Sequence, residues 1–400
     1  MAAAVRPIDV IFCQAGAIRH ENYPIRRKPW NVYGQLPRQM PPAREYWLVF
    51  RSDGAGIPAL EVVPDLTRMV AELLVEARRR GLNVAGIQLD VDSPTRSLAH
   101  YATFLREVRK GLPAGVQISI TALLDWFRPG TTVGGVVNLV DEFVPQFYDV
   151  QGDSAAIAAP VSAAKWSPVF NRYRKRFRIG LSTFGRARLV PRASTAAFIR
   201  DLKPLDIAID PAFQLQTSKT AAGELVLSYR AARKTRMGYT GIEPGDTVEF
   251  ILSTPEAIQA AMEQARLFRG YCAGVVLFRW PAWNETLAAQ PGEVLSAAGV
   301  LAQPQGKSGE LRVADGGCAA VHCVDLYLAN TGPLSAAPIR YRITSSAELE
   351  YFLPAERVPV RMSGAFRIEL SLPPYCGRSR LFLGRAVTLK QADFRLEEER

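Results

Sequence analysis

The sequence predicts an α/β protein, a (β/α)8 TIM-type barrel followed by a small C-terminal β-sandwich. From residue 8 to about 300, short apolar runs of strand type alternate with amphipathic runs of helical type, which is typical of a parallel sheet with helices outside it. No glycine-rich dinucleotide or phosphate-binding motif follows any strand, which argues against the alternative, an open doubly wound sheet. After Leu301 the chain changes to short strands separated by Gly, Pro and Asn turns.

Eight strands are expected in the barrel, with helices between them. The helix expected at 64–80 carries Leu66, Val70 and Leu73 on one face, and the helix at 255–269 begins at Pro255 with Thr254 as its N-cap. The strands are expected at 8–14, 46–53, 84–92, 116–126, 142–149, 176–184, 248–253 and 274–280.

Two segments interrupt this alternation. Residues 15–44 contain five prolines and are expected to form a long basic loop that walls the cleft. Residues 206–239 are expected to form a β-hairpin, with strands at 210–216 and 224–230.

Three regions follow from this pattern. Residues 1–301 are expected to form the barrel, residues 302–309 a linker, and residues 310–400 an accessory β-sandwich. The strands of the sandwich are expected at 321–328, 339–343, 366–372 and 380–383.

Composition and charge exclude several classes of partner. The 400 residues are 48% hydrophobic and 22% charged, which is enough to bury a core, and no apolar run reaches the roughly 18 residues of a membrane span. The net charge of +11 comes from 49 Lys and Arg against 38 Asp and Glu. No nucleic-acid-binding motif accompanies basic runs such as 172–178, so an acidic polysaccharide or a solvated face explains them better. We expect no nucleic-acid partner and no membrane span.

Cysteine and histidine usage predicts no metal site, and no motif predicts a cofactor. The five cysteines and three histidines lack the paired spacing of zinc ligands. The three cysteines after residue 310 allow one disulfide, which would imply an oxidising compartment. The N-terminus lacks the basic region and the separate apolar region of an export signal, so either the signal has been removed or the protein is cytoplasmic. We expect a periplasmic or secreted protein, with the cytoplasm as the alternative.

The strand that runs into Asp90-Val91-Asp92 is the most informative part of the chain. Alternation places Gln88, Asp90 and Asp92 on one face and the apolar residues between them on the other. The two aspartates would lie about 6.6 Å apart, close enough for one to raise the pKa of the other. Inward carboxylates at a barrel mouth are costly unless they are used, which favours an active site. The alternative is that they cap the helix that starts at Ser93-Pro94-Thr95.

Polar side chains also end the other expected strands. Because parallel strands share one carboxyl edge, acid, amide, phenol, guanidinium and indole groups would converge there, a mixture suited to the hydroxyls and C–H faces of sugars. Each residue alone also has a structural explanation, such as an indole that plugs the barrel, a core phenol, or an arginine paired with a carboxylate. The further candidates are Arg51, Asp53, Asp125, Trp126, Gln146, Tyr148, Asp149, Arg279 and Trp280.

Residues 86–92, residues 146–149 and the late strand that ends in Trp280 resemble the chitinase-like glycoside hydrolases of family eighteen. In that family the fourth strand ends in Asp-x-Asp-x-Glu and the sixth ends in Met-x-Tyr-Asp. More closely, residues 86–126 and 248–281 resemble an uncharacterised bacterial family of TIM-barrel proteins, a domain of unknown function. The resemblance covers roughly residues 80–285. It implies that Asp90 and Asp92 match the first motif, that Gln146, Tyr148 and Asp149 match the second, and that Trp280 forms the floor of the sugar subsite.

The chain departs from the motif at Pro94, which stands where the family has its proton-donating Glu. We therefore predict a glycoside hydrolase-like protein that acts on a polysaccharide, one that includes amino sugars, with Asp92 as general acid. Asp149 or Asp125 would be nucleophile or base. Tyr148 and Gln146 would stabilise the sugar, Trp280 and Trp126 would stack on it, and Arg51, Asp53 and Arg279 would bind it. The alternatives are a non-catalytic carbohydrate-binding barrel and an envelope-assembly protein.

Overall fold

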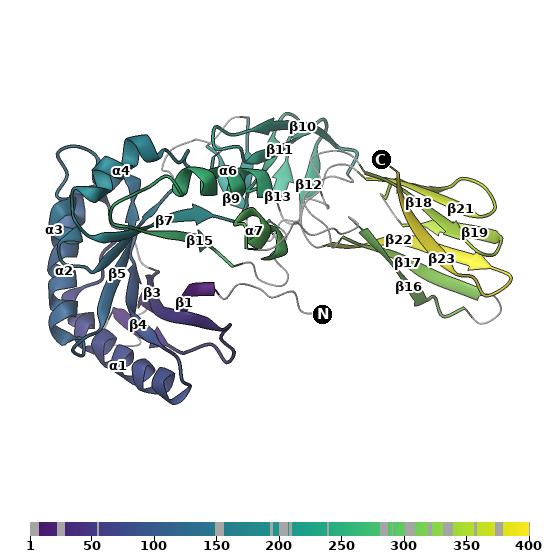
Figure 1. Ribbon diagram of the computed structural model, residues 1–400. Helices are drawn as coiled ribbons and strands as arrows, with labels where there is room; N and C mark the ends of the chain where they lie inside the picture. The colour runs from purple at the N-terminus through teal and green to yellow at the C-terminus, as the bar shows by residue number, and fades with distance from the viewer. Residues whose placement is uncertain are drawn as a thin grey trace. The chain divides into compact units, whose positions relative to one another are not determined.

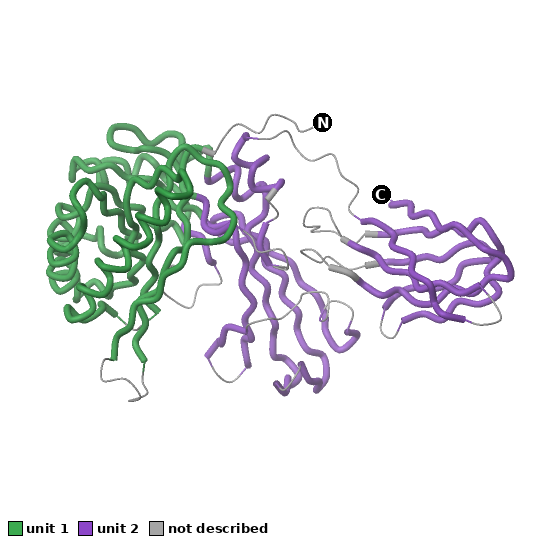
Figure 2. Tube along the Cα trace, turned by 90° about the horizontal axis from the view of Figure 1, so that it is seen from below, with its two compact units in different colours: residues 1–149, 160–181, 262–276 green, residues 150–159, 182–261, 277–400 purple. Residues whose placement is uncertain are grey.

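The structure is a computed structural model of the 400-residue chain. The description covers residues 8–21, 29–53, 56–148, 156–192, 195–199, 207, 210–237, 240–280, 287–289, 291–300, 309–318, 322–330, 339–355, 358–372 and 379–399. The chain divides into two compact units (Figure 2). The first comprises residues 1–149, 160–181 and 262–276, and the second comprises residues 150–159, 182–261 and 277–400.

The largest sheet has eight strands in the order β15-β7-β6-β5-β4-β3-β1-β2. All run parallel to their neighbours except β2, which is antiparallel to β1. Its strands are β1 (Ile8–His20), β2 (Trp30–Gly34), β3 (Ala43–Ser52), β4 (Val84–Asp90), β5 (Gln117–Leu123), β6 (Glu142–Gln146), β7 (Arg176–Ser182) and β15 (Cys272–Phe278).

Helices connect these parallel strands. Figure 1 shows α1 to α3 along one side of the sheet. Leu66, Val70 and Leu73 of α1 are buried, so the predicted apolar face is confirmed. No helix in the described ranges is long and apolar enough to cross a membrane. The helices are α1 (Val63–Arg79), α2 (Leu98–Gly111), α3 (Val133–Val137), α4 (Ala163–Asn171), α6 (Pro255–Ala265) and α7 (Pro291–Ala297), with 3-10 turns at Leu60–Val62, Thr95–Ser97 and Leu124–Phe127.

The expectation that residues 248–253 form a strand of the parallel sheet is wrong. This segment is β14 (Thr247–Leu252), which pairs antiparallel with β11 and β8 in a separate five-stranded sheet. Its fully buried residues Val248, Phe250 and Leu252 belong to the core of that sheet. The parallel strands therefore number seven in the described part of the chain, and the ladder runs from β15 to β2 without closing on itself.

The expectation of a long loop over 15–44 is also wrong in part. β1 continues to His20 and turns back into β2, with Trp30 opposite His20 and Tyr33 opposite Ala17. Ile18 is completely buried on the extended part of β1, so apolar burial continues the strand beyond its predicted end.

The hairpin expected within residues 206–239 is confirmed. β10 pairs with β11 in register from Phe213 opposite Ala231 to Lys219 opposite Leu225. The five-stranded sheet has the order β10-β11-β14-β8-β9, and a short β12-β13 ladder accompanies it. These strands are β8 (Arg186–Val190), β9 (Ala197–Ile199), β10 (Phe213–Lys219), β11 (Leu225–Ala231), β12 (Thr235–Met237) and β13 (Thr240–Ile242).

The C-terminal strands form two four-stranded antiparallel sheets, β16-β17-β22-β19 and β20-β21-β18-β23. Leu326 and Leu383 of the first sheet share one hydrophobic core with Ile343 and Ile368 of the second. The strands are β16 (Gly309–Asp315), β17 (His322–Asn330), β18 (Ile339–Ser345), β19 (Leu349–Pro354), β20 (Val360–Met362), β21 (Arg367–Leu372), β22 (Ser379–Thr388) and β23 (Phe394–Glu399).

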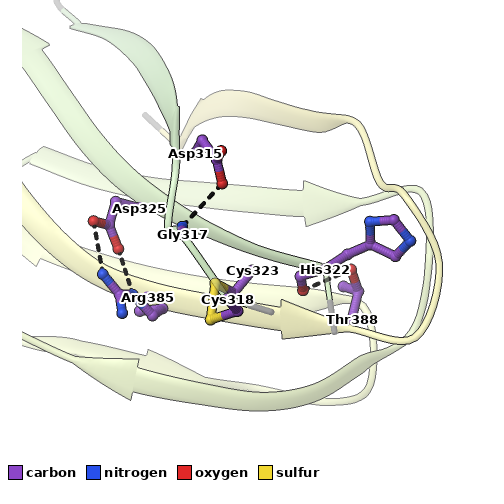
Figure 3. Close-up of a disulfide and its surroundings, with 8 residues drawn as sticks. All are labelled: Asp315, Gly317, Cys318, His322, Cys323, Asp325, Arg385 and Thr388. Atoms are coloured by element: carbon purple, nitrogen blue, oxygen red, sulfur yellow. Dashed lines mark hydrogen bonds and ion pairs between the residues drawn. A yellow bond between two sulfur atoms is a disulfide. The ribbon is translucent and has the colours of Figure 1, made fainter. Parts of the chain in front are cut away.

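A disulfide joins Cys318 to Cys323 at the start of β17, within the three C-terminal cysteines considered above (Figure 3). Cys376 lies outside the described residues. The disulfide closes the connection between β16 and β17, where the Gly317 amide also donates a hydrogen bond to the Asp315 carboxylate.

The contact between β4 and β5 gives the first testable prediction. Gly86 lies opposite Gln117, and a Cβ atom added at Gly86 would overlap the Gln117 carbonyl oxygen. Gly86→Ala should therefore lower the free energy of unfolding in urea by about 1–3 kcal/mol, the usual effect of overpacking. Gly135→Ala, on helix α3 where an added Cβ meets nothing within 4 Å, should raise it by about 0.5–1 kcal/mol. Equal effects of the two substitutions would contradict this packing.

Candidate functional site

Strand β4 delivers polar groups to one face of the sheet and apolar groups to the other. Ile87 and Leu89 are completely buried on the apolar face. On the polar face, the Gln88 amide donates a hydrogen bond to Ser119 Oγ of β5 at 3.1 Å. Thr121 Oγ1, two residues further along β5, donates to Asp90 Oδ1 at 2.7 Å. The predicted alternation is therefore present, and hydrogen bonds with β5 fix the side chains of Gln88 and Asp90.

Asp90 and Asp92 are electrostatically coupled. Burial raises the pKa of Asp90, and Asp53 adds to this, while the Thr121 hydrogen bond and the Arg51 charge oppose it. Asp92 lies two residues beyond Asp90 and is more exposed to solvent. Loss of hydration beside the surrounding protein raises the pKa of Asp92, the neighbouring Asp90 charge raises it further, and the Arg51 charge lowers it.

Residues at the end of β3 supply the charges next to this pair. Arg51 lies opposite Asp90 in the β3–β4 register. Its Nε is 3.6 Å from Asp53 Oδ1, and the other Asp53 oxygen accepts a hydrogen bond from Arg19 at 3.0 Å. Arg51 and Asp53 were both predicted from the sequence as binding residues, and the electrostatic coupling places both near Asp90.

Two buried phenols stand near the carboxylates. Tyr148, predicted from the sequence, and Tyr101, which sequence reasoning missed, both have a pKa well above the usual range. Burial is the main cause in each, and the Asp90 and Asp92 charges add to it. The Tyr101 hydroxyl is buried and has no hydrogen-bond partner within the described part of the chain. The one sequence signal for Tyr101 is an aromatic residue in the first turn of α2, directly after the Asp92 segment.

The helix-cap alternative for the aspartates does not fit the structure. The residue at the N-cap of the following 3-10 turn is Pro94, and the residue at the N-cap of α2 is Ser97. Neither start has a side-chain cap hydrogen bond. Thr121 binds Asp90 instead, so its carboxylate is held by the neighbouring strand and not by the helix.

Asp125 and Trp126 lie in the 3-10 turn directly after β5, and both make contacts within the protein. Asp125 pairs with Arg128, three residues along the chain, at 2.7 Å. Trp126 is completely buried, donates its indole N–H to the Ser93 carbonyl at 2.8 Å and packs edge-on against Tyr101. It therefore has no free face for a sugar and instead fixes the segment that follows Asp92.

The remaining predicted residues are Gln146, Asp149, Arg279 and Trp280. Gln146 is buried at the carboxyl end of β6. Asp149 lies outside the described residues. Arg279 and Trp280 are exposed just after β15 and belong to the second unit. Trp280 is 54% exposed, so its indole is open to solvent.

The basic run 172–178 is largely occupied by structural contacts. Arg178 is buried and its Nε is 3.0 Å from the buried Glu142 carboxylate, which Arg176 also contacts at 2.9 Å. Lys175 donates to the Val140 carbonyl. Burial raises the pKa of Glu142, and the two guanidiniums oppose this. Lys175, Arg176 and Arg178 therefore hold structural contacts, while Arg172 and Arg174 are exposed.

Within the described ranges, no three His, Cys, Asp or Glu side chains are grouped to hold a metal ion. The first unit is thus a parallel α/β domain with a coupled carboxylate pair at its carboxyl edge. Residues 43–240 match the family described as Domain of unknown function (DUF3142), which confirms the resemblance to an uncharacterised domain family. No curated protein matches the chain.

Three solved structures are similar to the chain. The spore cortex-lytic enzyme SleL of Bacillus cereus is 16% identical, with a TM-score of 0.40 over 64% of this chain and 59% of that one. SleL of Bacillus megaterium QM B1551 is 14% identical, with a TM-score of 0.38 over 58% and 56%. The chitinase domain of the spore coat protein CotE from Clostridium difficile is 11% identical, with a TM-score of 0.30 over 70% and 88%. The chain spans somewhat over half the length of the two SleL chains.

The burial of Asp90 gives a prediction about stability. Because the pKa of Asp90 is raised in the folded protein, ionisation of Asp90 lowers the free energy of unfolding. This loss of stability is absent below the pKa of the unfolded chain, about 3.9, and complete above the pKa of the folded protein. Asp90→Asn keeps an oxygen for Thr121 and removes the charge. It should raise the free energy of unfolding at pH 7 and leave it nearly unchanged at pH 3.

Thr121→Val is the matched variant of opposite sign. It removes the hydroxyl that stabilises the Asp90 carboxylate, and it should lower the free energy of unfolding at pH 7 by about 1.5–3 kcal/mol, with a smaller loss at pH 3. Urea unfolding at both pH values measures the difference. A destabilising Asp90→Asn at pH 7 would contradict the raised pKa.

Proposed function

We propose that the chain is a glycoside hydrolase-like protein that acts on a polysaccharide, with Asp90 and Asp92 at the reacting centre. The observation that carries the proposal is a pair of carboxyl groups with raised pKa at the end of β4, beside two buried phenols and Arg51. A carboxyl group with a raised pKa keeps its proton to higher pH than an ordinary aspartate, and a general acid must hold a proton for the sugar leaving group.

The pair divides into an acid and a charged partner. Asp90 is hydrogen-bonded by Thr121 and lies opposite Arg51, both of which favour its carboxylate form. Among the described residues, Asp92 has no such hydrogen-bond donor, and the Asp90 charge raises its pKa. Asp92 is also the more exposed of the two. We therefore assign Asp92 as general acid and Asp90 as the carboxylate whose charge raises the pKa of Asp92.

Other residues have supporting roles. Asp149 or Asp125 is the proposed nucleophile or base, and Tyr148 with Gln146 is proposed to stabilise the sugar. Trp280 is proposed to stack on the sugar, because it is exposed, whereas the buried Trp126 is not. Tyr101 is proposed to hold a buried water beside the site, because its buried hydroxyl has no hydrogen-bond partner among the described residues.

The strand order supports a barrel in preference to a doubly wound sheet. From β1 to β15, the seven parallel strands neighbour one another in chain order. A doubly wound sheet reverses its order at the ligand site, whereas a TIM-type barrel does not. Asp90 and Asp92 stand at the carboxyl end of β4, the end at which TIM-type barrels carry their active sites.

Pro94 favours a second candidate function, a non-catalytic carbohydrate-binding barrel. It occupies the position of the proton-donating Glu in the Asp-x-Asp-x-Glu motif and has no group to donate. Asp92 and Arg51 would then serve only to bind sugar hydroxyls.

The proposed location is periplasmic or extracellular. The disulfide between Cys318 and Cys323 supports it, because structural disulfides form and persist mainly in oxidising compartments. A cell fractionation that found the protein only in the cytoplasm would remove this support.

Asp92→Asn separates the enzyme from the binding protein. It keeps the shape and most hydrogen bonds of the side chain but removes the transferable proton, so turnover should fall by roughly 10²–10⁴-fold while binding survives. Because the wild type needs Asp92 protonated, its activity should fall as the pH rises through the raised pKa, and this alkaline limb should vanish in the variant. Reducing-end release from a polysaccharide panel measures turnover.

Asp141→Asn is the matched control, since Asp141 precedes β6 at the opposite edge of the sheet, where it accepts hydrogen bonds from Arg109 and the Ile118 amide. It should leave turnover unchanged. Full activity in Asp92→Asn would overturn the assignment of the acid. Binding of a glycan by the wild type without any hydrolysis would establish the second candidate.

A further inference from the structure

We propose that the outer face of the β16-β17-β22-β19 sheet is a binding platform for a neutral polysaccharide chain. The platform consists of Tyr327, Tyr351, Leu353 and Phe382. The proposal goes beyond the function proposed above, since it rests on the C-terminal strands alone, and these lie outside the residues that match the domain family.

The alternation of the strands places these side chains on one face. Tyr327 stands between the buried Leu326 and Leu328, and Phe382 stands between the buried Leu381 and Leu383. Since neighbouring residues of a strand point to opposite faces, both rings point away from the core.

The edge strand β19 adds to the same face. Its Phe352 is buried in the core, so Tyr351 and Leu353 on either side of it point outward. Tyr351 is 57% exposed, Leu353 is 53% exposed and Phe382 is 38% exposed, so the apolar surface is open to solvent.

The strand pairing brings the platform together across three adjacent strands. Tyr327 of β17 lies directly opposite Phe382 of β22, with their ring centroids 5.2 Å apart. Leu353 of β19 lies opposite Arg385 of β22, which in turn lies opposite Asp325 of β17. Along β22 the Tyr327–Phe382 ring pair comes first, then Arg385 with Asp325 and Leu353 on either side, and then Val387 with Tyr351 opposite it.

Among the side chains that the structure describes, two ion pairs lie on this face. Arg385 donates two hydrogen bonds to the Asp325 carboxylate, at 2.7 and 3.0 Å (Figure 3). Arg312 of β16, which faces outward because the adjacent Leu311 packs on the core, pairs with Glu310 at 2.9 Å. Two balanced ion pairs attract a polyanion weakly.

The chemistry of the face fits a neutral sugar chain. Exposed apolar patches rimmed by polar groups mark binding surfaces, and aromatic rings supply large contact area with little conformational entropy to lose. Sugars present C–H faces to rings and hydroxyls to paired carboxylates and guanidiniums. The two ion pairs described on this face are balanced in charge, whereas the chain as a whole carries a net charge of +11.

The test uses the full-length chain and two neutral insoluble polysaccharides, chitin and cellulose, with heparin-agarose as the polyanion comparison. The wild type should sediment with at least one neutral polymer and should remain bound in 0.5 M NaCl. The double variant Tyr351→Ala/Phe382→Ala should bind about tenfold more weakly or worse, a loss that corresponds to about 1.4 kcal/mol.

Phe366→Ala is the matched control. Phe366 is 47% exposed in the same module, next to β21 of the other sheet, and its loss should leave adsorption unchanged. Thermal unfolding of each variant checks the fold. If the double variant does not fold, the single variant Tyr351→Ala replaces it, because Tyr351 is largely outside the core.

Four results would overturn the proposal. These are no adsorption of the wild type to either neutral polymer, equal adsorption by the double variant, release by 0.5 M NaCl with preference for heparin, and a change from dimer to monomer in the double variant by sedimentation. The last would make the face an interface between two copies. Asp92→Asn should still adsorb, so failure of the platform and failure of the proposed hydrolysis are separately visible.

Discussion

The hydrogen bond from Thr121 to Asp90 is the interaction on which the proposed site depends. A carboxylate at this depth loses much of its hydration, and the protein must replace that hydration with donors and opposite charge. Thr121 supplies a donor from β5, and Arg51 supplies charge from β3 on the opposite side. Both interactions depend on the register of the strands. The close packing of Gly86 on β5 therefore affects the environment of the Asp90 carboxylate, four residues further along β4.

The same constraint extends along the polar face of the sheet. Gln88 is bonded to Ser119, and further along, Glu142 is bonded to Arg178. All four are buried, so each polar group needs a partner inside the protein. A buried ion pair that loses one member leaves an uncompensated charge, which costs about 3–5 kcal/mol. The polar face therefore has few tolerated substitutions even where no chemistry takes place.

Local periodicity predicted much of this site. The alternation through Asp90 and the apolar face of α1 needed only the spacing of residues within one element. Periodicity does not say which strands become neighbours, so β14 was assigned to the wrong sheet: its buried Val248, Phe250 and Leu252 suit either sheet equally. The partners of a strand depend on contacts with segments far away in the sequence.

Side-chain roles were harder to predict than strand faces. Trp126 is of a residue type that stacks on sugars, yet its indole N–H donates a hydrogen bond to the Ser93 carbonyl. Tyr101 lies in an ordinary amphipathic helix, and only the position of α2 in the fold brings its ring within the influence of two carboxylates. In both cases the role depends on what lies across the fold, which the sequence alone does not show.

Pro94 changes where chemistry would take place. In the motif that the chain resembles, the proton donor lies four residues after the first aspartate. Here Asp92 is the last acidic group, two residues earlier, which along an extended chain is about 6.6 Å nearer the strand. A glycosidic oxygen that reached Asp92 would then lie closer to the sheet than one that reached position 94. It would also lie closer to Asp90 and to the strand register that holds that carboxylate through Thr121.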